Sequence, residues 1–433
     1  MLTRMDSVRH IPSSPTVLSP CLSPTKILPR FSLPLRKFWS DERNRQLRLT
    51  SAAASAADSS PFDFSPPPID HDLPEKISVA GGKVSSDGVV ETFDNDDEAL
   101  DAFENGAVVV YLSHFGRIRV SGDDRIQFLH NQTTANFECL NEGQGCDTVF
   151  ISPTARTIDI AYSWVMKNSV VLVVSPTTCG SITEMLNKYI FFADKVGIQD
   201  ITKQTSLLVL AGPKSNQIMA NLNLDDLIGQ PYGNHRHYNI NGMPITVGVG
   251  SIVSDVGFSM LMSPSAAVSV WETLLSQGAI PMGSVAWEKL RILQGRPAPE
   301  KELGKEFNVL EVGLWNSISL NKGCYKGQET ISRLITYDGI KQKLCGLRLS
   351  AHAEPGSSIT LDDGKKVGKV TSCTSGRQES EYFGLGYVKK QAAWTGNRLL
   401  VGENIVGTIV EVPYLSRQSP PFDKSSSSLG GER

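Results

Sequence analysis

The sequence predicts an α+β fold followed by a small all-β barrel. Candidate strands and helices mix irregularly between residues 105 and 341, without the repeated β–α rhythm of a doubly wound parallel sheet. Beyond Gln342, short apolar segments are separated by a glycine about every eight to twelve residues, which is typical of a compact β-barrel. At 433 residues, the chain is long enough for two or three domains.

The expected strands of the larger domain are short apolar runs. They are AVVVYL at 107–112, ARTIDIAYSWV at 155–165, VVLVV at 170–174 and SLLVLAG at 206–212. Residues 237–250 predict a hairpin, because Asn241-Gly242 accepts the positive φ values of a type I′ turn. In the following domain, Asp363-Gly364 is a second hairpin signal.

Four helices are expected in the larger domain. Residues 123–129 begin with aspartates, which favour a first helical turn, and residues 181–191 place their apolar side chains on one helical face. Ser263-Pro264 predicts the start of a third helix that ends at Gly278. Ser284 is expected to cap a fourth helix, which ends at Gly295.

The two ends of the chain differ from its middle. Residues 1–40 contain six Lys/Arg, one acid, seven Ser and six Pro, and an Ala/Ser-rich tract follows at 51–60. This composition predicts a transit peptide over 1–60, for the chloroplast stroma or alternatively for the mitochondrial matrix. We expect a linker and acidic segment over 61–104, a main domain over 105–341, a barrel over 342–415 and a disordered tail over 416–433.

Composition argues against several classes of function. The net charge of −3 disfavours a nucleic-acid binder, and no apolar run reaches the length of a membrane-spanning helix. The seven cysteines are odd in number and include no C-x-x-C pair. We therefore expect no disulfide framework and no metal site.

The most specific motif is Lys322-Gly323-Cys324-Tyr325-Lys326-Gly327-Gln328-Glu329. Ammonium groups beside a thiol lower its pKa, and glycines allow tight turns and close approach of a ligand. This pattern predicts Cys324 as a reactive thiolate and Lys322 as the group that activates it. The alternative is a buried and inert cysteine, the common fate of a lone thiol.

These residues resemble the K-G-C-Y-x-G-Q-E signature of the YgfZ family, the folate-binding relatives of the glycine cleavage T-protein. The resemblance extends over roughly residues 105–415, and includes GSVAWEKLRILQGRP at 283–297, Ser332-Arg333 after the signature, and VSGDD with Phe128-Leu129 upstream. It implies a ring of three subdomains around a central folate-sized opening, the last of them a β-barrel. Residues 105–341 would then be a folate-binding, aminomethyltransferase-like domain.

The resemblance also implies a cofactor, tetrahydrofolate or a one-carbon derivative of it. Asp159 is the candidate carboxylate for the amino-pyrimidine edge of the pterin, because a carboxylate accepts two N–H bonds at once. The T-protein has two adjacent acids in this segment and an acid at the position of Ser259, and this chain departs from both patterns. Aminomethyl transfer from a lipoyl carrier is therefore not expected.

Four further residues of the signature region are candidate folate contacts. Arg333 would pair with the glutamyl carboxylates of the folate. Gln328 and Glu329 would hydrogen-bond the heterocycle or, alternatively, cap the following segment. Tyr325 would stack on the pterin or simply pack.

Three functions remain open from the sequence. The first is a tetrahydrofolate-dependent factor for iron–sulfur cluster assembly or repair in an organelle, with assembly proteins or client enzymes as partners. The second is a folate-dependent one-carbon transferase, in which the carboxylates matter more than the thiol. The third is a non-catalytic scaffold that binds folate.

Overall fold

The computed structural model describes residues 73–240, 242–376 and 381–418. The predicted transit peptide, Asn241 of the predicted hairpin turn and the tail beyond residue 418 lie outside these ranges. Among the helices of the described residues, none has both the length and the apolar character needed to cross a bilayer.

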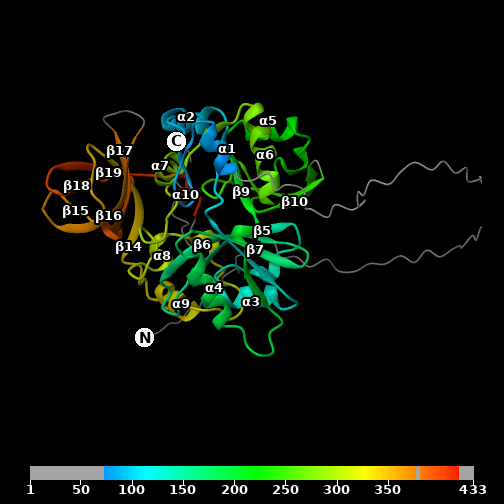
Figure 1. The fold of residues 1–433 in the computed structure, drawn as a ribbon. Coiled ribbons are helices and arrows are strands. Elements are labelled where there is room, and N and C mark those ends of the chain that lie inside the picture. The colour runs from blue at the N-terminus through cyan, green and yellow to red at the C-terminus, as the bar shows by residue number, and fades with distance from the viewer. Residues whose placement is uncertain (1–72, 241, 377–380, 419–433) are drawn as a thin grey trace, which may run out of the picture. The chain divides into compact units, whose positions relative to one another are not determined.

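Six strands form the first sheet, in the order β10-β11-β12-β9-β3-β13 (Figure 1). All neighbours in it are antiparallel except β13 and β3. The strands are β3 (Val108–Tyr111), β9 (Ser206–Ala211), β10 (His235–Ile240), β11 (Met243–Val249), β12 (Phe258–Met262) and β13 (Ile280–Met282). The predicted hairpin is thus confirmed as β10–β11, and Gly242 takes a φ of +81° in its turn.

Five antiparallel strands form the second sheet, in the order β5-β6-β7-β4-β8. They are β4 (Gly116–Ser121), β5 (Gln144–Ile151), β6 (Thr157–Val165), β7 (Ser169–Val174) and β8 (Gly197–Asp200). Alternate side chains along a strand point to opposite faces, so each sheet has two faces to cover. One buried cluster contains Val110 and Val209 of the first sheet with Trp164 and Val173 of the second, and it fills the space between the sheets.

Helices cover the outer faces of both sheets. Against the first sheet lie α1 (Leu73–Val79), α5 (Ser215–Asn221) and α6 (Pro264–Ser276), and against the second lie α3 (Arg125–Gln132) and α4 (Cys179–Lys188). The α6 helix begins after Ser263 as predicted. The α4 helix ends at Lys188, before the predicted end at 191, because the Asp194 carboxylate accepts the N–H of Phe191 and forms a separate turn.

Part of the expected linker and acidic segment over 61–104 is folded. From residue 73 onward it folds into α1, a ribbon of β1 (Lys83–Val84) and β2 (Val90–Thr92), and α2 (Asp96–Asn105). Leu73 and Ile77 are buried in the core beside the first sheet, and Phe103 is buried between the sheets. The acids lie on the exposed face of α2, and its few apolar residues are enough to anchor it.

The predicted C-terminal β-barrel is confirmed. Six strands close into a barrel because β14 pairs with both β17 and β19 (Figure 1). They are β14 (Gln342–Leu349), β15 (Ser358–Thr360), β16 (Lys366–Ser375), β17 (Tyr382–Lys389), β18 (Arg398–Val401) and β19 (Ile405–Val410). A last helical turn, α10 (Pro413–Ser416), leaves the barrel and returns toward the two sheets.

Three helices connect the sheets to the barrel. The α7 helix (Ser284–Gln294) ends at Gly295, whose φ of +79° is the left-handed conformation predicted there. It is followed by α8 (Val309–Val312) and α9 (Gln328–Thr336). Side chains of this connecting region, of β5 and β6 and of barrel strands β14 and β17 share one buried cluster, so the barrel is not an isolated appendage.

A buried ion pair fastens α7 to the barrel. Arg291 Nη1 donates to Glu302 Oε2 at 2.9 Å, and the Glu302 side chain is fully buried. The other carboxylate oxygen accepts the hydroxyls of Thr371 and Ser372 on β16, while the Tyr387 hydroxyl donates to the Glu302 carbonyl. Because every charged group here has partners, removal of one partner leaves the other buried and uncompensated.

We expect Glu302→Ala to lower the free energy of unfolding by about 3–5 kcal/mol, because Arg291 loses its buried counter-charge. Urea unfolding followed by circular dichroism measures this. The matched control is Glu306→Ala, whose pair with Lys369 is largely exposed and is worth less than about 1 kcal/mol. Equal losses for the two variants would show that the buried pair does not anchor the barrel.

Candidate functional site

A cavity of about 270 Å³ lies where the second sheet, the loop after β11 and the C-terminal turn meet. Its polar side chains come from five separate parts of the chain, and among them are Cys146, Asp147, Tyr232, Asp255, Asn316, Tyr414 and Arg417. Deep cavities with a few convergent polar groups are the usual form of small-molecule sites. We refer to this space as the central cavity.

Asp147 is the ionisable centre of the central cavity. One carboxylate oxygen accepts the Tyr232 hydroxyl at 2.7 Å, and the other accepts the Tyr414 hydroxyl at 3.3 Å. Burial raises the pKa of Asp147, and the charge of Arg296 and the two tyrosine hydroxyls oppose that rise. An ionised carboxylate has about four acceptor positions, so this one keeps acceptor capacity for a ligand.

The C-terminal turn supplies one wall of the central cavity. Arg417 forms an ion pair with Asp255, and its Cζ atom lies 5.2 Å from the centre of the Tyr414 ring. The side-chain amide of Asn316 donates to the Arg417 carbonyl at 2.7 Å. These contacts hold a guanidinium at the opening, where it can meet an anionic group of a ligand.

The signature motif folds into a loop that leads into α9. Gly327 has a φ of +81°, and a Cβ atom there would stand 2.9 Å from the Ser152 carbonyl oxygen. Both the conformation and the close approach to the loop after β5 therefore require glycine. The loop thus lies against the second sheet beside α3, where the Asn131 carbonyl accepts the N–H of Lys326.

The structure gives the Lys322 ammonium partners other than the Cys324 thiol. Its buried ammonium donates to the carbonyl oxygens of His130, Thr133 and Ala135, at and just beyond the C-terminal end of α3. Burial lowers its pKa to about 7, whereas three carbonyl acceptors favour the charged form. All three N–H groups are used in fastening the loop to α3, so none is left to solvate a thiolate at Cys324.

Cys324 is exposed and lines a depression of about 390 Å³ on the protein surface. The depression is formed by α3, the 3₁₀ turn at Phe137–Cys139 and the signature loop. His130, Glu138 and Lys326 line it with the thiol, and it shares no residue with the central cavity. Cys324 is therefore accessible, in contrast to the buried and inert cysteine that was the alternative.

Asp159, the predicted folate carboxylate, is fully buried on β6. It accepts the backbone N–H groups of Ile160 and Ser175 and the hydroxyls of Ser175 and Thr178. Burial raises its pKa against these hydrogen bonds. Its acceptors are occupied by the start of α4, and it is absent from the lining of the central cavity, so this geometry does not support a role in cofactor binding.

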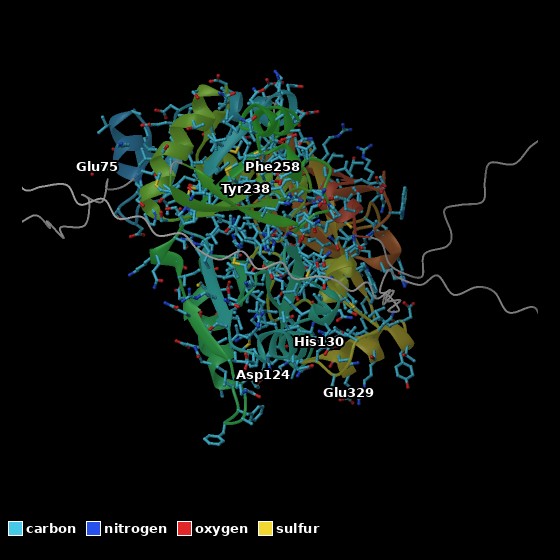
Figure 2. All side chains as sticks on the ribbon, turned by 90° about the vertical axis from the view of Figure 1, so that its right-hand side faces the viewer. Glu75, Asp124, His130, Tyr238, Phe258 and Glu329 are labelled. Atoms are coloured by element: carbon cyan, nitrogen blue, oxygen red, sulfur yellow. The ribbon has the colours of Figure 1, made fainter. Side chains whose placement is uncertain are left out.

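The other four predicted folate contacts lie in the signature loop and on the surface of α9. Tyr325 is buried beside the thiol depression, and burial raises its pKa to about 12. Gln328 accepts the N–H of Tyr325 at 3.2 Å and so stabilises the preceding loop rather than the following segment. Glu329 and Arg333 pair with each other on the exposed face of α9, and Figure 2 shows Glu329 at the periphery. None of these four lines the central cavity.

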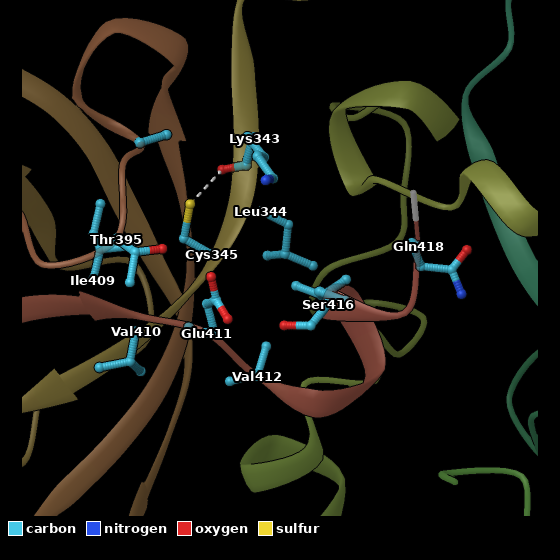
Figure 3. A pocket seen from close by; sticks show the side chains of 13 residues that line it. Lys343, Leu344, Cys345, Thr395, Ile409, Val410, Glu411, Val412, Ser416 and Gln418 are labelled. Carbon is cyan, nitrogen blue, oxygen red and sulfur yellow. Dashed lines mark hydrogen bonds between the residues drawn. The ribbon is translucent and has the colours of Figure 1, made fainter. Parts of the chain in front are cut away.

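A larger hollow of about 410 Å³ lies between barrel strands β14 and β19 and the C-terminal turn (Figure 3). Its thiol, Cys345, donates to the Lys343 carbonyl, and burial raises its pKa to about 11. A thiol in that state is a poor nucleophile at neutral pH. We take the central cavity, for its convergent polar groups, and the thiol depression, for its exposed cysteine, as candidate sites.

Sequence reasoning missed the residues that form the central cavity. Asp147 lies in a strand of ordinary composition, and Tyr232, Tyr414 and Arg417 are isolated in turns far from it in the sequence. No local spacing distinguishes them from surface residues. Only the return of the C-terminal turn to β5 brings them together. Among the described residues, no group of three His, Cys, Asp or Glu side chains could hold a metal ion.

We expect Lys322→Met to lower the free energy of unfolding by about 1–3 kcal/mol, because buried carbonyl groups lose their donor. Lys326→Met is the matched control, since its ammonium lies over the Tyr189 ring at 4.0 Å from the ring centre. That control is expected to cost less than about 1 kcal/mol. Urea unfolding compares the two variants. Equal losses in the free energy of unfolding would contradict the role of Lys322 in fastening the signature loop to α3.

Two family descriptions match consecutive parts of the chain. Residues 81–322 match the GCVT N-terminal domain, and residues 342–416 match the glycine cleavage T-protein C-terminal barrel domain. The second match covers the barrel and the C-terminal turn that closes the central cavity.

Proteins that are similar to most of this chain are named as transferases. A protein of Arabidopsis thaliana named "putative transferase, chloroplastic" is 73% identical over 99% of this chain and 98% of its own length. An aminomethyltransferase of Halothermothrix orenii is 24% identical over 72% of this chain and 90% of its own length.

A solved structure shows the same fold. The glycine cleavage system aminomethyltransferase T from Bartonella henselae superposes with a TM-score of 0.70 at 18% identity, over 80% of this chain and 98% of that one. The predicted T-protein-like α+β fold with a C-terminal barrel is therefore confirmed. From these matches and its own architecture, the chain belongs to the GCVT family of aminomethyltransferase-like proteins.

Proposed function

We propose that this protein binds a reduced folate in the central cavity and supports iron–sulfur cluster assembly or repair in the chloroplast, with Cys324 as its reactive group. One observation carries the folate part. Asp147 presents a half-buried carboxylate, oriented by two tyrosine hydroxyls, at the wall of a cavity that an arginine borders. The plastid location is supported by the N-terminal composition and by the chloroplastic relative.

The donor set of the central cavity fits a pterin. The amino-pyrimidine edge of a pterin carries two parallel N–H donors, and the free acceptor positions of Asp147 match them. Tyr232 and Tyr414 supply aromatic surface, and Arg417 supplies a cation for a glutamyl carboxylate. At about 270 Å³ the cavity suits the fused ring better than the whole cofactor.

A bound reduced folate would supply a carrier for a one-carbon unit. The residues of the chain would bind and orient it: Asp147 fixes the ring, and the Tyr232 hydroxyl fixes Asp147. Asp147 takes the place that the sequence suggested for Asp159, whose oxygens are occupied within the fold.

Cys324 carries the iron–sulfur part of the proposal. It is an exposed thiol within the run that resembles the YgfZ signature. A stable cluster usually takes four thiolate ligands, and one thiol does not provide them. We therefore place Cys324 in transient contact with a cluster or client, which is the substrate, rather than in permanent ligation.

One-carbon transfer is the competing function, and a specific observation favours it. The central cavity and the thiol depression share no residue, so chemistry on a folate beside Asp147 does not require the thiol. The names of the two sequence relatives point the same way. Variants that separate the two sites decide between the functions.

We expect a tetrahydrofolate derivative to bind the purified protein and to raise its Tm, because a ligand of the native state stabilises it. Asp147→Asn should weaken binding roughly 10-fold or more, since a charge-assisted hydrogen bond is worth about 1.5–3 kcal/mol. Titration calorimetry with 5-formyltetrahydrofolate measures both affinities. The control is Glu142→Gln, an exposed acid just before β5 that does not line the central cavity. Neither heat nor a Tm shift for the unaltered protein would overturn folate binding.

We expect Cys324→Ser to bind folate within twofold of the unaltered protein and yet to fail in cells. The readout is the activity of a plastid iron–sulfur enzyme in plants that lack the endogenous protein. Cys139→Ser, a change at another exposed cysteine, should restore that activity and serves as the control. Full rescue by Cys324→Ser together with failure of Asp147→Asn would instead favour one-carbon transfer.

A further inference from the structure

The thiol depression contains a buried histidine that no function considered so far uses. His130 lies in the last turn of α3, with only 1% of its surface exposed, and its imidazole lines the depression together with Cys324. A Cβ atom placed on Gly323 would stand 3.8 Å from Nε2 of that ring. The imidazole therefore borders the backbone immediately before the reactive cysteine.

One ring nitrogen of His130 lacks a hydrogen-bond partner in the described part of the chain. Nδ1 is buried and has no hydrogen-bond partner among the described residues, which is unusual for a buried polar atom. The nearest carboxylate oxygen, Oε2 of the half-exposed Glu138, lies 4.0 Å from Nδ1. A positive charge on the ring would strengthen that contact, because Nδ1–H would then become a charge-assisted donor.

We propose that His130 accepts the proton of Cys324 and that Glu138 orients and stabilises the imidazolium that results. The order is thiol, imidazole and carboxylate, the arrangement by which proteins activate a weakly nucleophilic side chain. The inference rests on the proposed role of Cys324 as the reactive group. It assigns a proton acceptor to that thiol, a role that Lys322 does not fill because its ammonium is bound to three carbonyl oxygens.

Charges around the ring keep it in the form that can accept a proton. Burial and then the Lys322 charge lower the pKa of His130, while Glu138 and Asn136 oppose that shift. Lys326 is the remaining charged group that lines the depression, and its ammonium points to the Tyr189 ring. A lowered pKa keeps the imidazole neutral at pH 7, which is the form that can accept a proton.

The reaction is a proton transfer followed by a displacement. The Sγ–H proton passes to Nε2, and the sulfur electron pair attacks a soft electrophile, whose leaving group departs with the electrons of the broken bond. No hydrogen bond joins Cys324 to His130 in the described structure, so the transfer uses rotation of the exposed Cys324 side chain or one bridging water. With iodoacetamide, the new bond is S–C, iodide leaves, and the imidazolium returns its proton to solvent.

The pH profile of alkylation tests this assignment. The full-length protein is treated with iodoacetamide between pH 5.5 and 9 (roughly the range that brackets histidine and thiol ionisation), with glutathione as an internal reference thiol. Mass spectrometry quantifies the Cys324 peptide. With His130 as proton acceptor, Cys324 stays reactive down to the pH at which the imidazole itself is protonated. At pH 7 we expect Cys324 to be alkylated at least about five times faster than glutathione, since an ordinary thiol is only a few per cent ionised there.

The decisive variant is His130→Gln, which removes the base and keeps a polar side chain of similar length. We expect Cys324 in this variant to be alkylated no faster than glutathione. The pH dependence of its alkylation should then follow the ionisation of an ordinary thiol, near about pH 8.5. If the variant remains folded by circular dichroism and its profile matches that of the unaltered protein, the assignment is overturned.

A second variant keeps the test valid if His130→Gln fails to fold. Glu138→Gln changes a half-exposed side chain and should leave the fold intact. We expect it to lower Cys324 reactivity at pH 7 about two- to threefold, and an unchanged profile would overturn the role of Glu138 as the orienting group. With His130→Gln unfolded, that outcome would also overturn the proton transfer. The assay contains neither folate nor cluster, so its result is independent of the binding and rescue experiments.

Discussion

The contact between Tyr414 and Asp147 is the constraint on which the candidate site depends. It joins the last helical turn of the described chain to the first strand of the second sheet, across 267 residues of sequence. Without it, Asp147 would face an open groove, and neither Tyr414 nor Arg417 would border the central cavity. Burial of a carboxylate is unfavourable unless donors compensate it, so the two tyrosine hydroxyls stabilise the closure as well as the ligand site.

Most of the fold could be predicted because its signals are local. The hairpin at 237–250, the start of α6 at Ser263-Pro264 and the left-handed end of α7 at Gly295 each follow from residue types at adjacent positions. The segment before residue 105 could not be predicted in the same way. Its many acids favour a solvent-exposed segment. Its few apolar residues are nevertheless buried against the sheets, and the sequence does not show which surface they would pack on.

The candidate site was predictable only where its residues are contiguous. The signature run identified Cys324, which the structure places in an accessible depression. It also singled out Lys322 as a neighbour of that thiol, but closeness in sequence does not determine the direction of a side chain, and the ammonium turns inward to the end of α3. Asp159 illustrates the same limit. Nothing in the neighbouring sequence indicates that its carboxylate oxygens will accept hydrogen bonds within the fold. Asp147 and His130 depend on tertiary contacts and carry no sequence signal of their own.

The position of the closing turn has a consequence for the order of folding. Tyr414 and Arg417 complete the lining of the central cavity, and they follow every strand of the two sheets and of the barrel in the sequence. Sheets that form before the closing turn docks therefore enclose no finished cavity. A ligand of this cavity cannot assist those early steps and can stabilise only the completed fold. A chain truncated before Tyr414 would keep every strand of the sheets and of the barrel and lose the site.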